Sequence, residues 1–312
     1  MAQQQQLRVL FLGMMNETSA TVLGALLDAG VNVCSVLVAA DRAGGPPIAR
    51  VLPEHSRSPL PIANPFLERT IAQIAWERDL PVFDLRQPAA PQTLALVAQL
   101  QPDVACVACC SQRIPPDLLA LPPLGFLNMH PALLPDHRGP APLFWVFRGG
   151  EPAAGVTIHF MDAGLDTGDI AAQASFALPD GVAGAVAERQ CNALGGRLML
   201  AALQGLRDGT LSRRPQPPGG SYQPWPAPDD WRIATSWTAR RAFNFMRGTA
   251  EWGQPYIVQA GGEELVLAAA LANDPHDVLH KAFVRAGDEV LIQFAAGVLR
   301  ARAGGQGDKV TR

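Results

Sequence analysis

Apolar residues in the N-terminal part of the chain alternate between two kinds of run. Short continuous runs such as Leu7–Gly13 and Val31–Ala40 suit strands that are buried on both faces of a parallel sheet. Between them, residues 19–30 carry apolar side chains at helical spacing and end at Gly30. Further along, the pattern predicts helices over 66–80, 93–101 and 181–209, and strands over 81–85, 102–110 and 125–130. This alternation predicts an α/β domain with a Rossmann-like, doubly wound, mostly parallel sheet.

A change of pattern follows residue 209. Residues 210–228 are rich in proline and glycine and predict a linker. Beyond the linker, a helix over 236–248 and several short strands with turns predict a small β-rich domain over 229–304. We expect the larger domain over 1–209 and a disordered tail over 305–312.

Composition narrows the functional classes. The chain of 312 residues has a formal net charge of −3, so no overall basic excess points to nucleic acid, although a local basic patch stays open. Five cysteines in apolar runs do not form a disulfide framework. No signal peptide and no long apolar span are recognised, which predicts a cytoplasmic protein. The turn after the first strand, "FLGMMNETS", lacks the glycines of a dinucleotide fingerprint, which argues against a NAD enzyme.

The segment "GFLNMHP" places candidate chemistry at the end of a strand. Asn128 and His130 are two positions apart, so a strand directs both side chains to one face, and the strand ends at Pro131. Ligands of open parallel sheets bind at the carboxyl ends of strands. An amide can donate to an oxyanion and an imidazole can move a proton, whereas the alternative is that both residues only cap the turn.

An acidic partner is available in the turn "MDAGLDTGD". Asp162, Asp166 and Asp169 all lie there, and aspartates in turns often serve only to cap backbone N–H groups. The residues alone do not separate the three. His159, just before this turn, is expected to be an ordinary strand residue.

Together, "LNMHPALLPDHRGPAP" and "GVTIHFMDAGLDTGDI" resemble the folate-dependent formyltransferase family, most nearly the methionyl-tRNA formyltransferases. In that family the first motif supplies a catalytic Asn and His and the second an Asp, which here match Asn128, His130 and Asp166. The resemblance implies that 1–209 is the formyltransferase catalytic domain and that the C-terminal domain is an OB-like β-barrel.

The resemblance also implies a donor, 10-formyltetrahydrofolate, and no metal. It places the folate against two backbone segments and the loop after the Asn-x-His motif. These residues are Cys109, Cys110, Ser111, Gln112, Arg113, Leu133, Leu134, Pro135, Asp162, Ala163, Gly164 and Leu165.

The expected acceptor is the amino group of initiator methionyl-tRNA. The stretch 41–65, with six prolines, lies where the tRNA enzymes carry basic residues, and here it offers Arg42 as a candidate for substrate binding. Arg138 could bind a substrate carboxylate or phosphate, or could tie down its own loop. Two alternatives stay open. One is formylation of a small amine, such as an amino sugar or a hydroxylated amino acid, and the other is a non-catalytic folate- or protein-binding relative.

Overall fold

The computed structural model describes residues 6–40, 44–53 and 69–304, which belong to two compact units. The first unit comprises 1–138, 155–175 and 190–221, and the second comprises 139–154, 176–189 and 222–312. The predicted disordered tail, 305–312, lies outside the described residues. The end of the larger domain at residue 209 and the start of the C-terminal domain at residue 229 remain predictions.

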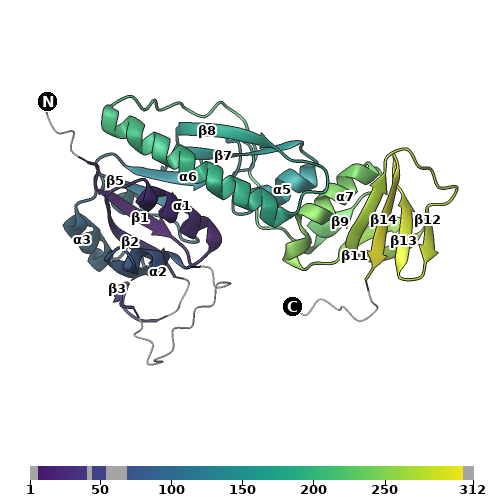
Figure 1. The fold of residues 1–312 in the computed structure, drawn as a ribbon, viewed down its shortest axis with the longest axis horizontal. Helices are drawn as coiled ribbons and strands as arrows, with labels where there is room; N and C mark the ends of the chain where they lie inside the picture. The colour runs from purple at the N-terminus through teal and green to yellow at the C-terminus, as the bar shows by residue number, and fades with distance from the viewer. Residues whose placement is uncertain (1–5, 41–43, 54–68, 305–312) are drawn as a thin grey trace. The chain divides into compact units, whose positions relative to one another are not determined.

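The first unit is built on an eight-stranded sheet (Figure 1). Its strands are β1 (Val9–Gly13), β2 (Val33–Ala39), β3 (Ile48–Val51), β4 (Val82–Leu85), β5 (Val104–Ala108), β6 (Phe126–His130), β7 (Ala153–Phe160) and β8 (Ile170–Ala177). Their order is β3-β4-β2-β1-β5-β6-β7-β8. Strands β4, β2, β1, β5 and β6 run parallel, while β3 and β7 are antiparallel to their neighbours β4 and β6. The predicted α/β class with a mostly parallel sheet is confirmed.

Helices alternate with these strands. They are α1 (Glu17–Asp28), α2 (Ile71–Trp76), α3 (Pro91–Leu100), α4 (Pro116–Leu119) and α6 (Gly184–Asp208). Side chains of α3 and α4 share a hydrophobic core with β1, β2 and β5. At the start of α1, the side chain of Asn16 accepts a hydrogen bond of 2.9 Å from the backbone N–H of Ser19, which satisfies one of the unpaired donors of the first turn.

Helix α2 is shorter than the predicted helix over 66–80. Thr70 and Gln73 form a reciprocal capping box, so the helix begins at Ile71. It ends at Trp76, and Asp79 then adopts a left-handed conformation with φ 57°. Residues 66–68 of the predicted helix lie outside the described residues.

Strand β3 lies within 41–65, where the sequence pattern predicted no strand. Ile48–Val51 pairs antiparallel with Val82–Leu85 and forms the edge of the sheet. The strand is only four residues long, and its exposed Arg50 interrupts the apolar pattern. Its partner lies some thirty positions along the chain, so only tertiary pairing reveals it.

Helix α6 contains two consecutive glycines, Gly195 and Gly196, residues of low helix propensity. A Cβ at Gly195 would lie 2.2 Å from Sδ of Met129, and one at Gly196 would lie 3.1 Å from Cβ of Ala25. The glycines therefore let α6 approach β6 and α1 closely. Met129 points away from the face that carries Asn128 and His130, so α6 supports the reverse side of the candidate site.

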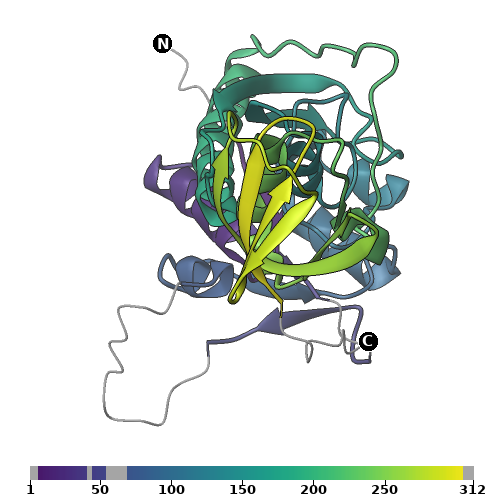
Figure 2. The same cartoon turned by 90° about the vertical axis from the view of Figure 1, so that its right-hand side faces the viewer.

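The second unit contains a six-stranded sheet with the order β12-β13-β14-β11-β10-β9 (Figures 1 and 2). Its elements are α5 (Pro142–Gly149), η1 (Pro228–Trp231), β9 (Arg232–Ile233), α7 (Ala239–Gly248), η2 (Ala250–Trp252), β10 (Tyr256–Ala260), β11 (Glu263–Asp274), β12 (Phe283–Ala286), β13 (Glu289–Gln293) and β14 (Val298–Ala303). All pairs are antiparallel except β9–β10. The β-rich C-terminal region is as predicted, whereas α5 was not.

Aromatic packing holds this second unit together. Phe144 of α5, Phe245 of α7, Trp231 and Tyr256 are buried, with ring centroids 5.0–6.1 Å apart in tilted or edge-to-face pairs. This core includes Trp231, just after the predicted linker, whereas Tyr222 and Trp225 within the linker are exposed. Across the part of the chain that the structure describes, no helix has the length and apolar character needed to cross a lipid bilayer.

Candidate active site

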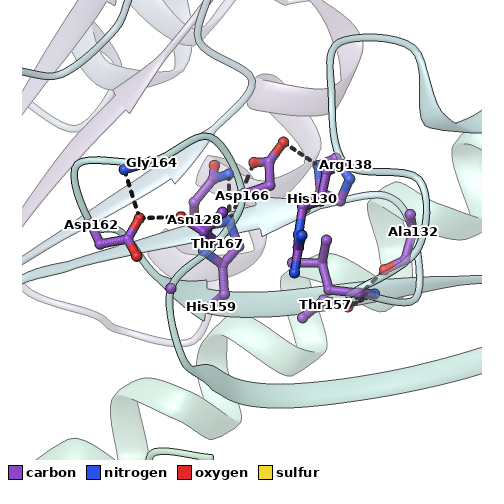
Figure 3. Close-up of polar contacts among 12 residues, drawn as sticks. Asn128, His130, Ala132, Arg138, Thr157, His159, Asp162, Gly164, Asp166 and Thr167 are labelled. Carbon is purple, nitrogen blue, oxygen red and sulfur yellow. Dashed lines mark hydrogen bonds and ion pairs between the residues drawn. The ribbon is translucent and has the colours of Figure 1, made fainter. Parts of the chain in front are cut away.

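Two neighbouring strands of the first unit bring four polar side chains to one face. In the antiparallel pair of β6 and β7, Asn128 lies opposite His159, and His130 lies opposite Thr157. Directly opposed residues of such a pair share a face, as do alternate residues of one strand. The side chains therefore gather at one place (Figure 3). Asn128 and His130 share a face as expected, and the register adds His159 and Thr157.

The carboxylate of Asp166 lies between two imidazoles. Its Oδ2 is 3.7 Å from Nδ1 of His130, and its Oδ1 is 3.5 Å from Nε2 of His159. All three side chains are buried, with exposed fractions of 8% for Asp166, 4% for His130 and 2% for His159. The carboxylate favours protonation of the ring nitrogens that face it, whereas burial favours the neutral rings, so the two influences oppose each other. The three groups can therefore act as one proton-handling cluster.

The other two aspartates of the turn have different roles. Oδ1 of Asp162 accepts hydrogen bonds from the backbone N–H of Gly164 at 3.0 Å and from the hydroxyl of Thr167 at 2.7 Å, so it caps the turn. Asp169 contributes its backbone carbonyl, which accepts a 2.8 Å hydrogen bond from the last residue of β7. The geometry thus separates Asp166 from its neighbours, which the residue pattern alone could not do.

Backbone constraints position Asp166. Its φ of 55° lies in the left-handed region, which Asp tolerates better than most residues. Gly168 lets the turn close on β7, because a Cβ there would lie 1.8 Å from the carbonyl oxygen of Phe160. Gln216 holds the turn from another side, since its Nε2 donates to the backbone carbonyls of Asp166 and Gly168, each at 2.8 Å. Nothing in the sequence pattern had marked Gln216.

The proton arrangement of His130 follows from one contact. Its Nε2 lies 2.8 Å from the carbonyl oxygen of His137, and because a carbonyl only accepts, this nitrogen carries the proton. Nδ1 then faces Asp166. Burial lowers the pKa of the His130 imidazole below its usual value, and the opposing influence of Asp166 is smaller. The favoured form near neutral pH is a neutral ring with its lone pair toward the carboxylate.

His159 is the residue that sequence reasoning underrated. It lies in a strand as expected, but its Nε2 is 3.1 Å from Nδ2 of Asn128 as well as close to Asp166. Its Nδ1 is 3.0 Å from the carbonyl oxygen of Phe160. Only the register of β6 against β7 brings this ring to the site, and the sequence does not show that register.

The loop after β6 is fastened to β7 and β8. The Thr157 hydroxyl accepts a 3.1 Å hydrogen bond from the backbone N–H of Leu134 and donates a 2.7 Å bond to the carbonyl of Ala132. Nε2 of Gln173 donates to the carbonyl of Leu134 at 2.9 Å. Leu133–Pro135, which the resemblance places at the folate, therefore lie in an anchored loop.

Two segments expected to contact folate are joined in the structure. The guanidinium of Arg113 donates to the carbonyl of Ala163. Nε2 of Gln112 donates to the carbonyls of Ala40 and Leu85, at 2.9 and 3.2 Å, where β2 and β4 end. Its buried Oε1 has no hydrogen-bond partner among the residues that the structure describes. The other expected residues lie in the same two segments: Cys109, Cys110, Ser111, Asp162, Gly164 and Leu165.

The two arginines expected at the substrate differ in outcome. The guanidinium of Arg138 donates to Oε1 of Gln216 from Nη2 at 2.7 Å and from Nε at 3.2 Å. Arg138 therefore ties down its own loop, which is one of the two roles expected for it; the other is binding of a substrate carboxylate or phosphate. Arg42 lies outside the described residues. Within 6–40, 44–53 and 69–304, no group of three or more His, Cys, Asp or Glu side chains is arranged to hold a metal ion.

Comparison with known proteins identifies the family of the chain. A family profile described as formyl transferase matches residues 8–199. The chain is 33% identical to the methionyl-tRNA formyltransferase of Pelotomaculum thermopropionicum, over 79% of this chain and 73% of that one. It is 29% identical to the methionyl-tRNA formyltransferase of Geobacter metallireducens, over 94% of this chain and 89% of that one.

Solved structures share the fold. The N-formyltransferase from Helicobacter canadensis aligns with a TM-score of 0.66 at 16% identity, covering 94% of this chain and 98% of that one. HypX from Aquifex aeolicus aligns with a TM-score of 0.59 at 17% identity, covering 95% of this chain and 45% of that one. At such identities the likeness concerns the fold only. The profile match over 8–199 and the identity to curated relatives show that the chain belongs to the formyl transferase family and is a formyltransferase.

Proposed function

We propose that this formyltransferase transfers the formyl group of 10-formyltetrahydrofolate to the amino group of methionyl-tRNA. The observation that carries the acceptor is the identity to methionyl-tRNA formyltransferases, which at 29% extends over 94% of the chain and so includes the C-terminal sheet. Support for a folate donor comes from the shared fold, since solved relatives are complexes with folinic acid and with tetrahydrofolic acid.

The carboxyl edge of the sheet suits such a donor. The Oε1 of Gln112 is a buried acceptor without a partner among the described residues, and a pterin carries N–H groups that could bind it. Arg113 bridges to Ala163, so the end of β5 and the turn that carries Asp166 form one wall. A few placed polar groups of this kind suit a flat heterocycle, whose edges carry donors and acceptors.

The donor supplies the formyl group, whose carbon is attacked by the acceptor amine. A bond from carbon to the acceptor nitrogen forms, the bond to the folate nitrogen breaks, and one amine proton moves to the folate nitrogen. Asn128 donates an N–H to the oxygen that becomes negative. Asp166 faces Nδ1 of His130, so it can stabilise the ring when that nitrogen gains a proton during transfer. For His130 to donate from Nε2 to that oxygen, this N–H must leave the carbonyl of His137.

A direct assay tests both the acceptor and the site. Purified protein is given 10-formyltetrahydrofolate with charged initiator tRNA or with nucleotide-linked amino sugars, and the formylated product is quantified. Asp166→Asn keeps the shape and tolerates the left-handed backbone, so we expect kcat to fall by about 10²-fold or more with little change in folding. Asp169→Asn makes the same chemical change in the same turn, and we expect kcat within about threefold of the wild type, because the carboxylate that faces the two imidazoles is that of Asp166 and Asp169 contributes a backbone carbonyl.

Two outcomes would contradict the proposal. Formylation of an amino sugar without formylation of methionyl-tRNA would reject the acceptor. Equal damage from Asp166→Asn and Asp169→Asn would reject the assignment of the site.

A small amine is the second candidate acceptor. It is favoured by the net charge of −3 and by the absence of lysine between residues 41 and 65, since RNA binding gains most of its affinity from cationic contacts to phosphates. The amino-sugar arm of the assay decides between the two acceptors.

A further inference from the structure

We propose that His159 is a positioning residue of the formyl-transfer site, which holds the side-chain amide of Asn128 in one of its two orientations. In that orientation, Asn128 keeps a second N–H for the oxygen that becomes negative. The inference rests on the proposed function, in which Asn128 is a donor to that oxygen.

The tautomer of His159 follows from its backbone contact. Nδ1 lies 3.0 Å from the carbonyl oxygen of Phe160. A carbonyl accepts and never donates, so Nδ1 carries the ring proton. In the neutral ring, Nε2 is then a lone pair, and it points to Asn128 at 3.1 Å. Strand β7 itself supplies the carbonyl, so the ring is oriented by the backbone next to it.

A lone pair at Nε2 selects one orientation of the Asn128 amide. The two ends of an amide have nearly the same shape, but only the NH₂ end can donate to a lone pair. The Asn128 side chain makes no other hydrogen bond to the described residues, so this contact determines which end faces which way. One N–H is used by His159, and the other N–H remains for a substrate oxygen.

The charged groups around His159 show why the neutral ring matters. Asp166 faces it from the turn, with Oδ1 at 3.5 Å from Nε2, and His130 lies on the other side of that carboxylate. A proton on Nε2 would make the ring a donor to Asp166. Asn128 could then approach His159 only with its carbonyl end. The neutral ring is therefore the form that keeps the amide nitrogen in place.

Burial alone could also explain a histidine at this position, so the variants must separate the two roles. His159→Gln places an amide group near the position of Nε2, where it can accept from Asn128. His159→Asn places an amide group near the position of Nδ1, where it can reach only the carbonyl of Phe160. Both side chains are polar and smaller than or similar in size to His, so a purely structural role predicts similar effects. His159→Phe keeps the volume without either hydrogen bond.

Steady-state kinetics of the full chain with the acceptor that gives turnover provide the first readout. We expect His159→Asn and His159→Phe to lower kcat by about 10- to 100-fold with KM for 10-formyltetrahydrofolate changed less than about threefold, because the lost orientation acts on the reacting oxygen. We expect His159→Gln to recover kcat to within about fivefold of the wild type. Wild-type kcat in His159→Asn, or equal loss in the Gln and Asn variants, would overturn the proposal.

A spectroscopic readout is independent of turnover. In a long-range proton–nitrogen correlation spectrum of histidine-labelled wild-type protein, assigned by its difference from His159→Asn, we expect a neutral ring protonated at Nδ1. A ring protonated at Nε2, or at both nitrogens, at neutral pH would overturn the proposal. If the wild type formylated no acceptor, the proposed function would fail, whereas the spectrum would still decide whether His159 presents a lone pair to Asn128.

Discussion

The position of Asp166 depends on a glycine that makes no contact with substrate in the proposed mechanism. In Gly168→Ala, the new Cβ would start 1.8 Å from the carbonyl oxygen of Phe160 and 2.9 Å from its carbon. Contacts of Cβ below 3.0 Å essentially do not occur, so the turn and the end of β7 must separate by more than 1 Å. Asp166 is two residues away and rests at 3.5–3.7 Å from its two imidazole partners. A displacement of that size breaks both contacts.

We expect Gly168→Ala to affect the catalytic rate more than the free energy of unfolding. Misplacing a catalytic group by about 1 Å lowers the rate by roughly 10²-fold, whereas overpacking costs about 1–3 kcal/mol of unfolding free energy. We therefore expect kcat/KM for formyl transfer to fall by about two orders of magnitude while the protein still unfolds cooperatively in a denaturant titration. Gly24→Ala is the matched control, because its Cβ would meet nothing within 4 Å in the middle of α1. It should leave kcat/KM unchanged and add up to about 1 kcal/mol of stability.

Near-normal kcat/KM in Gly168→Ala would refute the reasoning, provided that Asp166→Asn shows its expected loss of kcat. That pair of results would mean that the carboxylate is needed but that its backbone position is not. A crystal structure of the variant with Asp166 undisplaced would lead to the same conclusion.

Two further predictions concern the supports of the cluster. Gln216→Leu removes the donor to the carbonyls of Asp166 and Gly168 together with the partner of Arg138. We therefore expect kcat to fall and the free energy of unfolding to drop by about 0.5–1.5 kcal/mol per lost hydrogen bond. Unchanged kcat in Gln216→Leu would contradict the role of Gln216. The folded-state pKa of His130 is lowered, so as the pH falls the unfolded chain binds a proton at His130 before the folded chain does. The contribution of neutral His130 to the free energy of unfolding should be complete above a pH of about 6.5. It should be lost as the pH falls from there to the folded-state pKa, with a slope of at most about 1.4 kcal/mol per pH unit. Urea titrations of the wild type and His130→Asn check this, and an identical pH dependence of the two would contradict it.

Much of the fold follows from local patterns. Mostly apolar runs predicted β1, β2, β5 and β6, because strands of a parallel sheet are covered on both faces. The elements that the pattern missed depend on partners distant in the chain. Edge strand β3 exists through its pairing with β4, and α5 is held by aromatic rings from the C-terminal region of the same unit.

Some residues of the site could likewise be predicted from sequence, and others only from the structure. Asn128 and His130 share a face because strand geometry has a period of two, which can be read from sequence. Selecting Asp166 from three aspartates needed the resemblance to formyltransferases, and the structure adds the reason, since Asp162 is occupied as a cap of the turn. Gln216 could not be found from sequence, because its role consists of hydrogen bonds to a turn some fifty positions away.

Local sequence therefore determined the class of the sheet, the strand end that carries the Asn-x-His pair and the acidic turn that follows it. Each of these depends on spacing within a few residues, where backbone geometry is set by sterics and burial. Tertiary structure decided which groups touch. The register of β6 on β7 brought His159 to Asn128, and the closure of the turn at Gly168 set the carboxylate between two rings. Registers and closures depend on the packing of the whole sheet, so no short segment of the chain encodes them.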